Sequence, residues 1–208
     1  MKRARTDEAK EDRRAALLKA ALDTFYEHGF RAARMDDIAR RAGVSKGAVY
    51  LYFDSKDALF EALIEDLATP NIERAEAIMR SAPSFDMAVT QFAAFAPYML
   101  QETDLPKLMK ILVGDSQFFP DVISNYRRNN LERLIGALKT LLTEAHARGE
   151  IDAPDADLTA RLIVAPMAFA GMWQAVFGRD PEAAMDLPAL FALHAANIRK
   201  ALRPEAPE

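Results

Sequence analysis

The stretch AGVSKGAVYLYFDSK, residues 42–56, gathers side chains that can bind phosphate groups. Lys46 and Lys56 supply two cations, and the hydroxyls of Tyr50 and Tyr52 can donate hydrogen bonds to phosphate oxygens. The stretch is too polar and too rich in turn-forming residues for a core helix. Its residue types therefore indicate a surface that contacts a polyanion.

Two short helices are needed to position these side chains. The apolar spacing predicts helices over about 35–42 and 46–53, joined by a turn in which Gly43 supplies a positive φ. Ser45 is placed to cap the second of them. Helices this short are marginal in water, so their apolar positions must pack together: Ile38, Ala39, Ala42, Val44, Val49 and Phe53. These are the requirements of a helix-turn-helix, whose second helix can enter the major groove of DNA.

The surface that remains on the helix over 46–53 consists of Lys46, Gly47, Ala48, Tyr50, Leu51 and Tyr52. Gly47 and Ala48 permit close approach of a ligand, and the helix N-terminus favours a phosphate. Lys56 begins the next helix, where a cation is misplaced for the helix dipole, and an external phosphate would explain it. Two alternatives stay open: the tyrosines pack against neighbouring helices, or the lysines are only solvated.

Charge is distributed unevenly along the chain. The 208 residues carry a net charge of −4, yet residues 1–56 hold 13 Lys or Arg against 9 Asp or Glu, and residues 57–208 hold 14 against 22. Only the first quarter of the chain therefore suits a polyanion. A solvated helix face explains four of its arginines equally well: Arg13, Arg14, Arg40 and Arg41. The basic residues Lys2, Arg3 and Arg5 could reach a neighbouring groove or only keep the chain soluble.

Apolar residues recur at helical spacing along the whole sequence without strand-like alternation, so we predict an all-α fold. The first helix is expected over about 6–28, stopped by Gly29. A long helix over 56–79 follows the helix-turn-helix, capped by Ser55 or Asp54. Further helices over 85–102, 105–115, 120–148, 155–177 and 187–202 bring the total to about nine. The tail RPEAPE is expected to be unstructured.

The sequence DDIARRAGVSKGAVYLYFDSKDALFEAL resembles the DNA-binding signature of the tetracycline-repressor (TetR) family. The resemblance extends from about Ala15 through Leu63. It implies a homodimeric repressor with a helix-turn-helix domain, a variable ligand-binding domain and a double-stranded DNA operator as partner. In that family, the positions that match the following residues meet DNA: Lys46, Gly47, Ala48, Tyr50, Tyr52 and Lys56.

The chain departs from the family pattern at two places. Family members usually have Thr followed by Ser or Thr just before the helix over 35–42, where this chain has Ala33 and Arg34. The usual hydroxyl cap would then be missing, and Arg34 could restore the phosphate contact as a charge. The threonine that commonly follows the glycine is Ala48 here, which removes one hydroxyl contact. We count Arg34 and Ser45 among the expected DNA-binding residues.

We expect a DNA-binding domain over 1–56 and a ligand-binding and dimerisation domain over 57–208, with the helix over 56–79 as connector. Aromatic and methionine side chains concentrate in the second domain and would suit a hydrophobic or aromatic effector. The same side chains are also what any helical core contains. The candidate pocket residues are Phe92, Phe95, Met99, Met109, Phe118, Tyr126, Met167 and Trp173.

The helix over 155–177 is apolar nearly all round and needs partners on two sides. Together with a stripe on the last helix it could form a four-helix interface between two chains. The candidate interface residues are Leu162, Ala165, Phe169, Leu190, Phe191, His194 and Ile198. The alternative is a monomer whose last helix closes its own core.

The resemblance implies a repressor that leaves a palindromic operator when a small molecule binds its second domain. The alternative is a helical small-molecule carrier without DNA function. We expect no enzyme, metal site or cofactor, because the chain has no cysteine and His28, His146 and His194 are far apart in the sequence. The N-terminus lacks the apolar core of a signal peptide, and the longest apolar run is short for a membrane span, so a cytoplasmic protein is expected.

Overall fold

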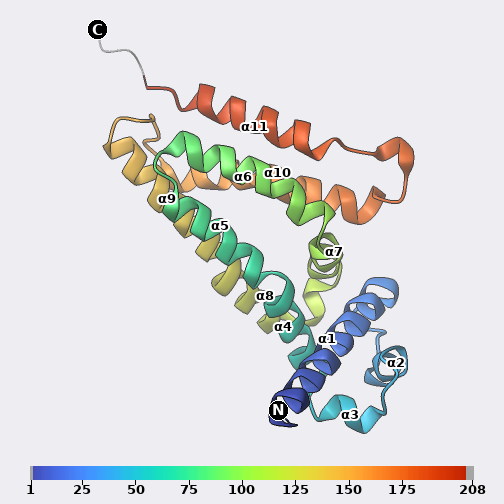
Figure 1. Ribbon diagram of the computed structural model, residues 1–208. Coiled ribbons are helices and arrows are strands. Elements are labelled where there is room, and N and C mark those ends of the chain that lie inside the picture. The colour runs from blue at the N-terminus through green and yellow to red at the C-terminus, as the bar shows by residue number, and fades with distance from the viewer. Residues whose placement is uncertain (1, 205–208) are drawn as a thin grey trace. The chain divides into compact units, whose positions relative to one another are not determined.

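The computed structural model describes residues 2–204 and the side chains of residues 7–204. Over residues 2–204 the chain forms helices and no strand, which confirms the all-α prediction (Figure 1). The expectations for the side chains of Lys2, Arg3 and Arg5, and for residues 205–208 of the tail, lie outside this part of the chain.

The helices group into two compact units. The first comprises Met1–Leu67 and Lys107–Asn125, and the second comprises Ala68–Pro106 and Tyr126–Glu208. The first unit is therefore larger than the segment 1–56 taken from the sequence. It includes a helix that follows the helix-turn-helix and a segment that returns from the middle of the chain.

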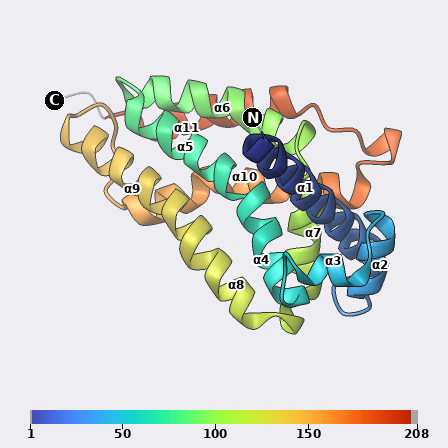
Figure 2. The same ribbon diagram turned by 60° about the horizontal axis from the view of Figure 1, so that its bottom comes forward.

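The first unit is built around the helix-turn-helix. Its elements are α1 (Lys2–His28), α2 (Met35–Arg41), α3 (Lys46–Tyr50), α4 (Lys56–Leu67), and most of α7 (Leu105–Asp115) and α8 (Pro120–Tyr126). Helix α2 contacts both α1 and α3, and α1 also contacts α4 (Figures 1 and 2). Four rings form the core beneath them: Phe25, Phe30, Phe60 and Phe119. The ring of Phe119 lies 4.7 Å from those of Phe30 and Phe60, which explains why the returning segment belongs to this unit.

The end of α1 is fixed by a glycine and an aspartate. Gly29 takes a φ of +76° and ends the helix, as predicted. The next backbone nitrogen, that of Phe30, donates to Oδ2 of Asp115 at 2.8 Å. Since Asp115 is the last residue of α7, this hydrogen bond ties the returning segment to the loop before α2.

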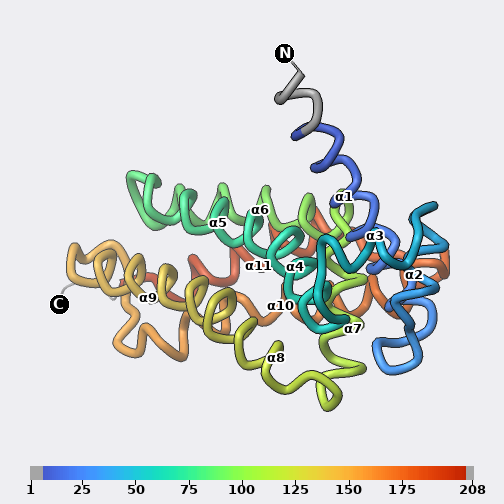
Figure 3. Tube along the Cα trace, turned by 90° about the horizontal axis from the view of Figure 1, so that it is seen from below, coloured from blue at the N-terminus to red at the C-terminus, as the bar shows by residue number. Residues whose placement is uncertain are grey.

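The second unit contains the remaining helices: α5 (Thr69–Ser81), α6 (Phe85–Gln101), α9 (Glu132–Ala147), α10 (Ala156–Phe177) and α11 (Leu187–Ala201). Helix α5 contacts α6 and α9, α6 contacts α11, and α9 contacts α10 (Figure 3). Three helices begin at side-chain caps, because Ser84, Asp155 and Asp186 each accept a backbone N–H three residues on. Helix α10 has the length and apolar content of a membrane span, which core helices of soluble proteins share.

Several predicted helix limits differ from the structure. The helix expected over 56–79 is interrupted at Ala68, because Pro70 in the first turn of α5 lacks a backbone N–H. The helix expected over 120–148 contains a π-helical turn, Arg127–Leu131, between α8 and α9. Counting α4 with α5 and α8 with α9 gives the nine predicted helices within residues 2–204. Helix α3 ends at Tyr50 instead of residue 53.

Candidate nucleic-acid interface

The turn between α2 and α3 has the predicted geometry. Gly43 takes a φ of +69°, and the backbone nitrogen of Val44 donates to the carbonyl of Ala39 at 3.0 Å. The hydroxyl of Ser45 accepts a hydrogen bond from the backbone nitrogen of Ala48 at 3.2 Å, so Ser45 caps α3. A glycine conformation and a capped helix start together fix the direction of α3.

The outward face of α3 carries most of the residues expected there. Val49 is fully buried, whereas Lys46 and Gly47 are exposed and Tyr50 is 43% exposed. A Cβ at Gly47 would meet nothing within 4 Å, so the backbone here is open to close approach. Ala48 and Tyr52 are half-buried and so lie less fully on the surface than expected. Leu51 is 84% exposed, as expected for the outward face.

Lys46 is paired with a carboxylate on the preceding helix. Its Nζ lies 2.8 Å from Oδ1 of Asp36, and both side chains are largely exposed. The hydrogen bond and the charge of Asp36 raise the pKa of Lys46, so this cation is fully protonated at neutral pH. In the free protein, Asp36 therefore partly neutralises the cation at the start of α3.

Lys56 has an internal role that the sequence did not reveal. Its Nζ donates to the carbonyls of Phe30 at 2.6 Å, Ala33 at 3.1 Å and Arg31 at 3.3 Å. It also lies 4.5 Å from the centre of the Phe30 ring. Burial lowers the pKa of Lys56, and the charge of Asp57 opposes this shift. An external phosphate is therefore not needed to explain a cation at this helix start, because three loop carbonyls already accept from it.

Arg34 occupies the N-cap position of α2 in an extended conformation, and its side chain makes no capping hydrogen bond. Helix α2 therefore begins without a side-chain cap, as the sequence predicted. Nearby arginines are paired: Arg41 donates to both carboxylate oxygens of Glu27 at 2.6 and 2.7 Å, and Arg40 pairs with Asp37. These pairs lie on the surface and reduce the cationic charge of α2.

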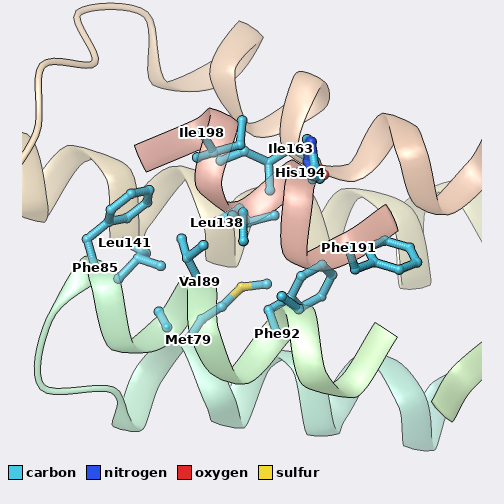
Figure 4. Close-up of a pocket in the computed structure, with 13 residues that line it drawn as sticks. Met79, Phe85, Val89, Phe92, Leu138, Leu141, Ile163, Phe191, His194 and Ile198 are labelled. Atoms are coloured by element: carbon cyan, nitrogen blue, oxygen red, sulfur yellow. The ribbon is translucent and has the colours of Figure 1, made fainter. Parts of the chain in front are cut away.

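The second unit contains an apolar cavity between its helices (Figure 4). The cavity has a volume of about 30 Å³. Its walls come from α5, α6, α9, α10 and α11, and its lining residues are Met79, Phe85, Ala88, Val89, Phe92, Ala93, Leu138, Leu141, Ile163, Phe191, His194, Ala195 and Ile198. His194 is the only one of them with a polar side chain, and one of its ring nitrogens is 3.0 Å from the carbonyl oxygen of Ile163.

Of the predicted pocket residues, this cavity includes Phe92 alone. Phe95, Met99 and Met167 pack in the surrounding cores, Tyr126 is half-buried, and Trp173 donates to the carbonyl of Ala183. Met109 and Phe118 belong to the first unit, where Arg31 lies over the ring of Phe118. These two residues lie away from the cavity, because the segment 107–125 packs in the first unit against α1, the loop after it and α4.

The expected dimer residues divide into two groups. On α10, Leu162, Ala165 and Phe169 are exposed on one helical face, with Leu162 67% and Phe169 57% exposed. On α11, Phe191, His194 and Ile198 line the internal cavity, and Leu190 packs on the core beside it, so these four residues point less outward than the α10 residues. The exposed apolar face of α11 consists of Ala189, Leu193 and Ala196.

A capped α3 in a helix-turn-helix within an all-α chain is typical of DNA-binding transcriptional regulators. Residues 17–63 match the profile of "Bacterial regulatory proteins, tetR family", and residues 87–192 match "AefR-like transcriptional repressor, C-terminal domain". The chain belongs to the TetR family of transcriptional regulators.

Three known proteins illustrate the similarity. YhgD of Bacillus subtilis, an uncharacterised HTH-type transcriptional regulator, is 26% identical over 149 residues, or 72% of this chain and 77% of YhgD. RutR of Escherichia coli K12, an HTH-type transcriptional regulator, is 46% identical over 66 residues, which span only 30% of RutR and 32% of this chain. FadR of Bacillus subtilis, solved in complex with stearoyl-CoA, aligns with a TM-score of 0.63 and 20% identity, covering 91% of this chain and 99% of FadR.

Proposed function

We propose that this protein is a dimeric repressor that binds a palindromic DNA operator through α3 and releases it when a hydrophobic small molecule binds the second unit. The observation that carries the proposal is the outward face of α3, where Lys46, Gly47 and Tyr50 are exposed on a helix held by buried Val49. Family membership agrees with this reading and disfavours a carrier without DNA function.

The proposed DNA contacts follow from the chemistry of α3. Lys46, after leaving Asp36, supplies a cation to a phosphate or a guanine edge at the helix N-terminus. Tyr50 offers a hydroxyl to a phosphate oxygen, and Leu51 offers an apolar surface to a thymine methyl group. Lys56 supports this surface from inside by holding the loop before α2.

Helix α2 and the loop after α3 complete the proposed DNA surface. Arg34 is exposed, and its side chain does not cap α2, so its guanidinium is available to a phosphate. Tyr52 is half-buried beside Phe53, with ring centres 6.3 Å apart, and can contribute its hydroxyl at the edge of the surface. Ser45 already accepts from its own helix and acts there as a cap.

The effector is proposed to be hydrophobic because the internal cavity has an almost entirely apolar lining. The fold neighbour FadR was solved with stearoyl-CoA, a ligand with a long apolar chain. A cavity of about 30 Å³ holds little more than a water molecule or two, so such a ligand must displace side chains as it binds.

Dimerisation is proposed through the exposed apolar faces of α10 and α11. Leu158, Leu162, Ala165 and Phe169 follow each other at helical spacing on α10, and Leu193 is 62% exposed on α11. Exposed apolar surface on two long helices is typical of an interface between copies. A dimer would present two copies of α3, which must lie about 34 Å apart to enter successive major grooves.

Regulation then follows from linkage between the two sites. A ligand that binds better to a dimer with wrongly spaced α3 helices weakens DNA binding, and DNA weakens binding of the ligand by the same coupling free energy. This coupling is typically about 1–3 kcal/mol.

The test is binding of the purified protein to DNA from upstream of its own coding region, measured at two salt concentrations. With about six phosphate contacts, affinity should fall about a thousandfold between roughly 50 and 200 mM salt. Lys46→Ala should weaken binding and reduce the salt dependence, whereas Lys139→Ala, an exposed lysine on α9, should change neither. Equal binding by the Lys46 and Lys139 variants would contradict the assignment of α3.

A further inference from the structure

A second hollow lies on the surface of the second unit, between α5 and α9. It has a volume of about 660 Å³ and is open to solvent. Its lining is mostly polar and includes the apolar side chains Met79 and Leu141, two glutamates and three arginines: Glu76, Glu144, Arg80, Arg133 and Arg148. We call this hollow the α5–α9 groove.

The groove has one guanidinium that is free to bind an anion. Arg133 donates to both carboxylate oxygens of Glu76, at 2.8 and 3.1 Å, and Arg148 donates to Glu150 at 2.6 Å. Arg80 is exposed and has no ionic or hydrogen-bonding partner within the described residues. A carboxylate on a ligand can therefore pair with Arg80 without breaking an existing ion pair.

The groove and the internal cavity share a wall. Met79 from α5 and Leu141 from α9 line both of them, so these two side chains lie between the groove and the cavity. Figure 4 shows both side chains at the cavity, which Ile163 of α10 and His194 of α11 also line. Met79 is 5% and Leu141 7% exposed, so both side chains are buried where the groove meets the cavity.

We propose that the α5–α9 groove and the internal cavity together form one site for an amphipathic carboxylate. The carboxylate pairs with Arg80 in the groove, and the aliphatic chain passes Met79 into the apolar cavity. The inference rests on the proposed effector function and names the class of the effector: a fatty-acid-like monoanion.

Met79 is suited to act as the movable side chain at the passage. An unbranched thioether has three rotatable bonds and adapts to new neighbours at low cost, whereas Leu141 is branched and stiffer. Without this movement, the cavity is too small for an aliphatic chain. Displacing Met79 joins the groove to the cavity, and the aliphatic chain of the ligand then makes the apolar contacts that the Met79 side chain made before. The chain would then lie among Phe85, Val89 and Phe92 of α6.

The head and the chain can be tested separately with decanoate and 1-decanol, which share a chain and differ in charge. Their binding to the full-length protein is measured by calorimetry without DNA. Arg80→Gln should weaken decanoate binding about fivefold to tenfold and leave decanol binding unchanged. Arg179→Gln, an exposed arginine outside the groove, is the matched control and should affect neither ligand.

The passage is tested by filling the groove. A Cβ on Gly136, which lines the groove, meets nothing within 4 Å, so Gly136→Phe adds a ring without disturbing the core. It should weaken binding of both ligands at least about tenfold. Gly114→Phe on α7, where a Cβ also meets nothing within 4 Å, is the matched control. Thermal unfolding of each variant checks that it is folded.

The proposal would be overturned by decanoate binding that does not respond to Arg80→Gln, or by binding of both ligands that does not respond to Gly136→Phe. Absence of decanoate binding to the wild-type protein would also overturn it. Each of these results leaves the proposed regulator function standing if the same preparation binds its operator specifically. Loss of operator binding itself would instead contradict the proposed function.

Discussion

Replacing Lys56 with methionine separates the internal role of this lysine from a role in DNA contact. Methionine keeps an apolar stem over the Phe30 ring but removes the ammonium that donates to three loop carbonyls. A hydrogen bond to a charged group contributes about 1.5–3 kcal/mol when it is well shielded from water. Because Lys56 is only partly buried, we expect Lys56→Met to lower the free energy of unfolding by about 2 kcal/mol in total.

The assay is urea unfolding at neutral pH, followed by DNA binding at a temperature where both proteins are folded. Lys46→Met is the control, since its exposed pair with Asp36 should contribute less than about 1 kcal/mol to stability. We expect the Lys46 variant to lose DNA affinity at unchanged stability, and the Lys56 variant to lose stability. A Lys56→Met protein as stable as the wild type, within about 0.5 kcal/mol, would refute the internal role.

Three further outcomes follow from the structure. Gly43→Ala should cost about 1–2 kcal/mol in urea unfolding, because φ is +69° although a Cβ there has free space; an unchanged midpoint would contradict this. Asp36→Asn should tighten DNA binding about threefold by freeing Lys46 and removing a repulsive charge, as measured by fluorescence anisotropy; weaker binding would argue against α3 as the DNA-facing helix. Leu162→Glu should raise the dissociation constant of the dimer about tenfold or more, as measured by analytical sedimentation, whereas a dimer of unchanged stability would place the interface elsewhere.

The helix-turn-helix could be predicted in detail because its constraints are local. Gly43 is needed for a positive φ, Ser45 for a cap, and Val49 for a buried contact, and each of these lies within a few residues of the others. Local backbone chemistry of this kind is readable from the order of residues.

The lining of the cavity and the exposed faces of α10 and α11 could not be read from the sequence alone, because they depend on tertiary placement. Met109 and Phe118 are apolar residues in the middle of the chain, but Asp115 and Phe119 bind their segment to the first unit. Helix α11 has apolar residues on two faces, so periodicity alone could not decide whether Phe191 or Leu193 faces the core.

Lys56 illustrates a different limit. A lysine at a helix start looks functional from the sequence, because its partners are backbone carbonyls that the sequence does not display. Those carbonyls belong to the loop after α1, more than twenty residues earlier in the chain. A bond of this type becomes visible only when α1, α2 and α4 are placed together.

The most direct test of the account is selection of bound sequences from a pool of random DNA, followed by footprinting on the enriched site. We expect two half-sites related by two-fold symmetry, with centres about 10 base pairs or a multiple of that apart. A Lys46→Ala/Tyr50→Ala variant should lose both enrichment and footprint. Absence of an enriched sequence, or a footprint that the α3 variant leaves unchanged, would contradict the claim that this protein is a dimeric regulator that reads DNA through α3.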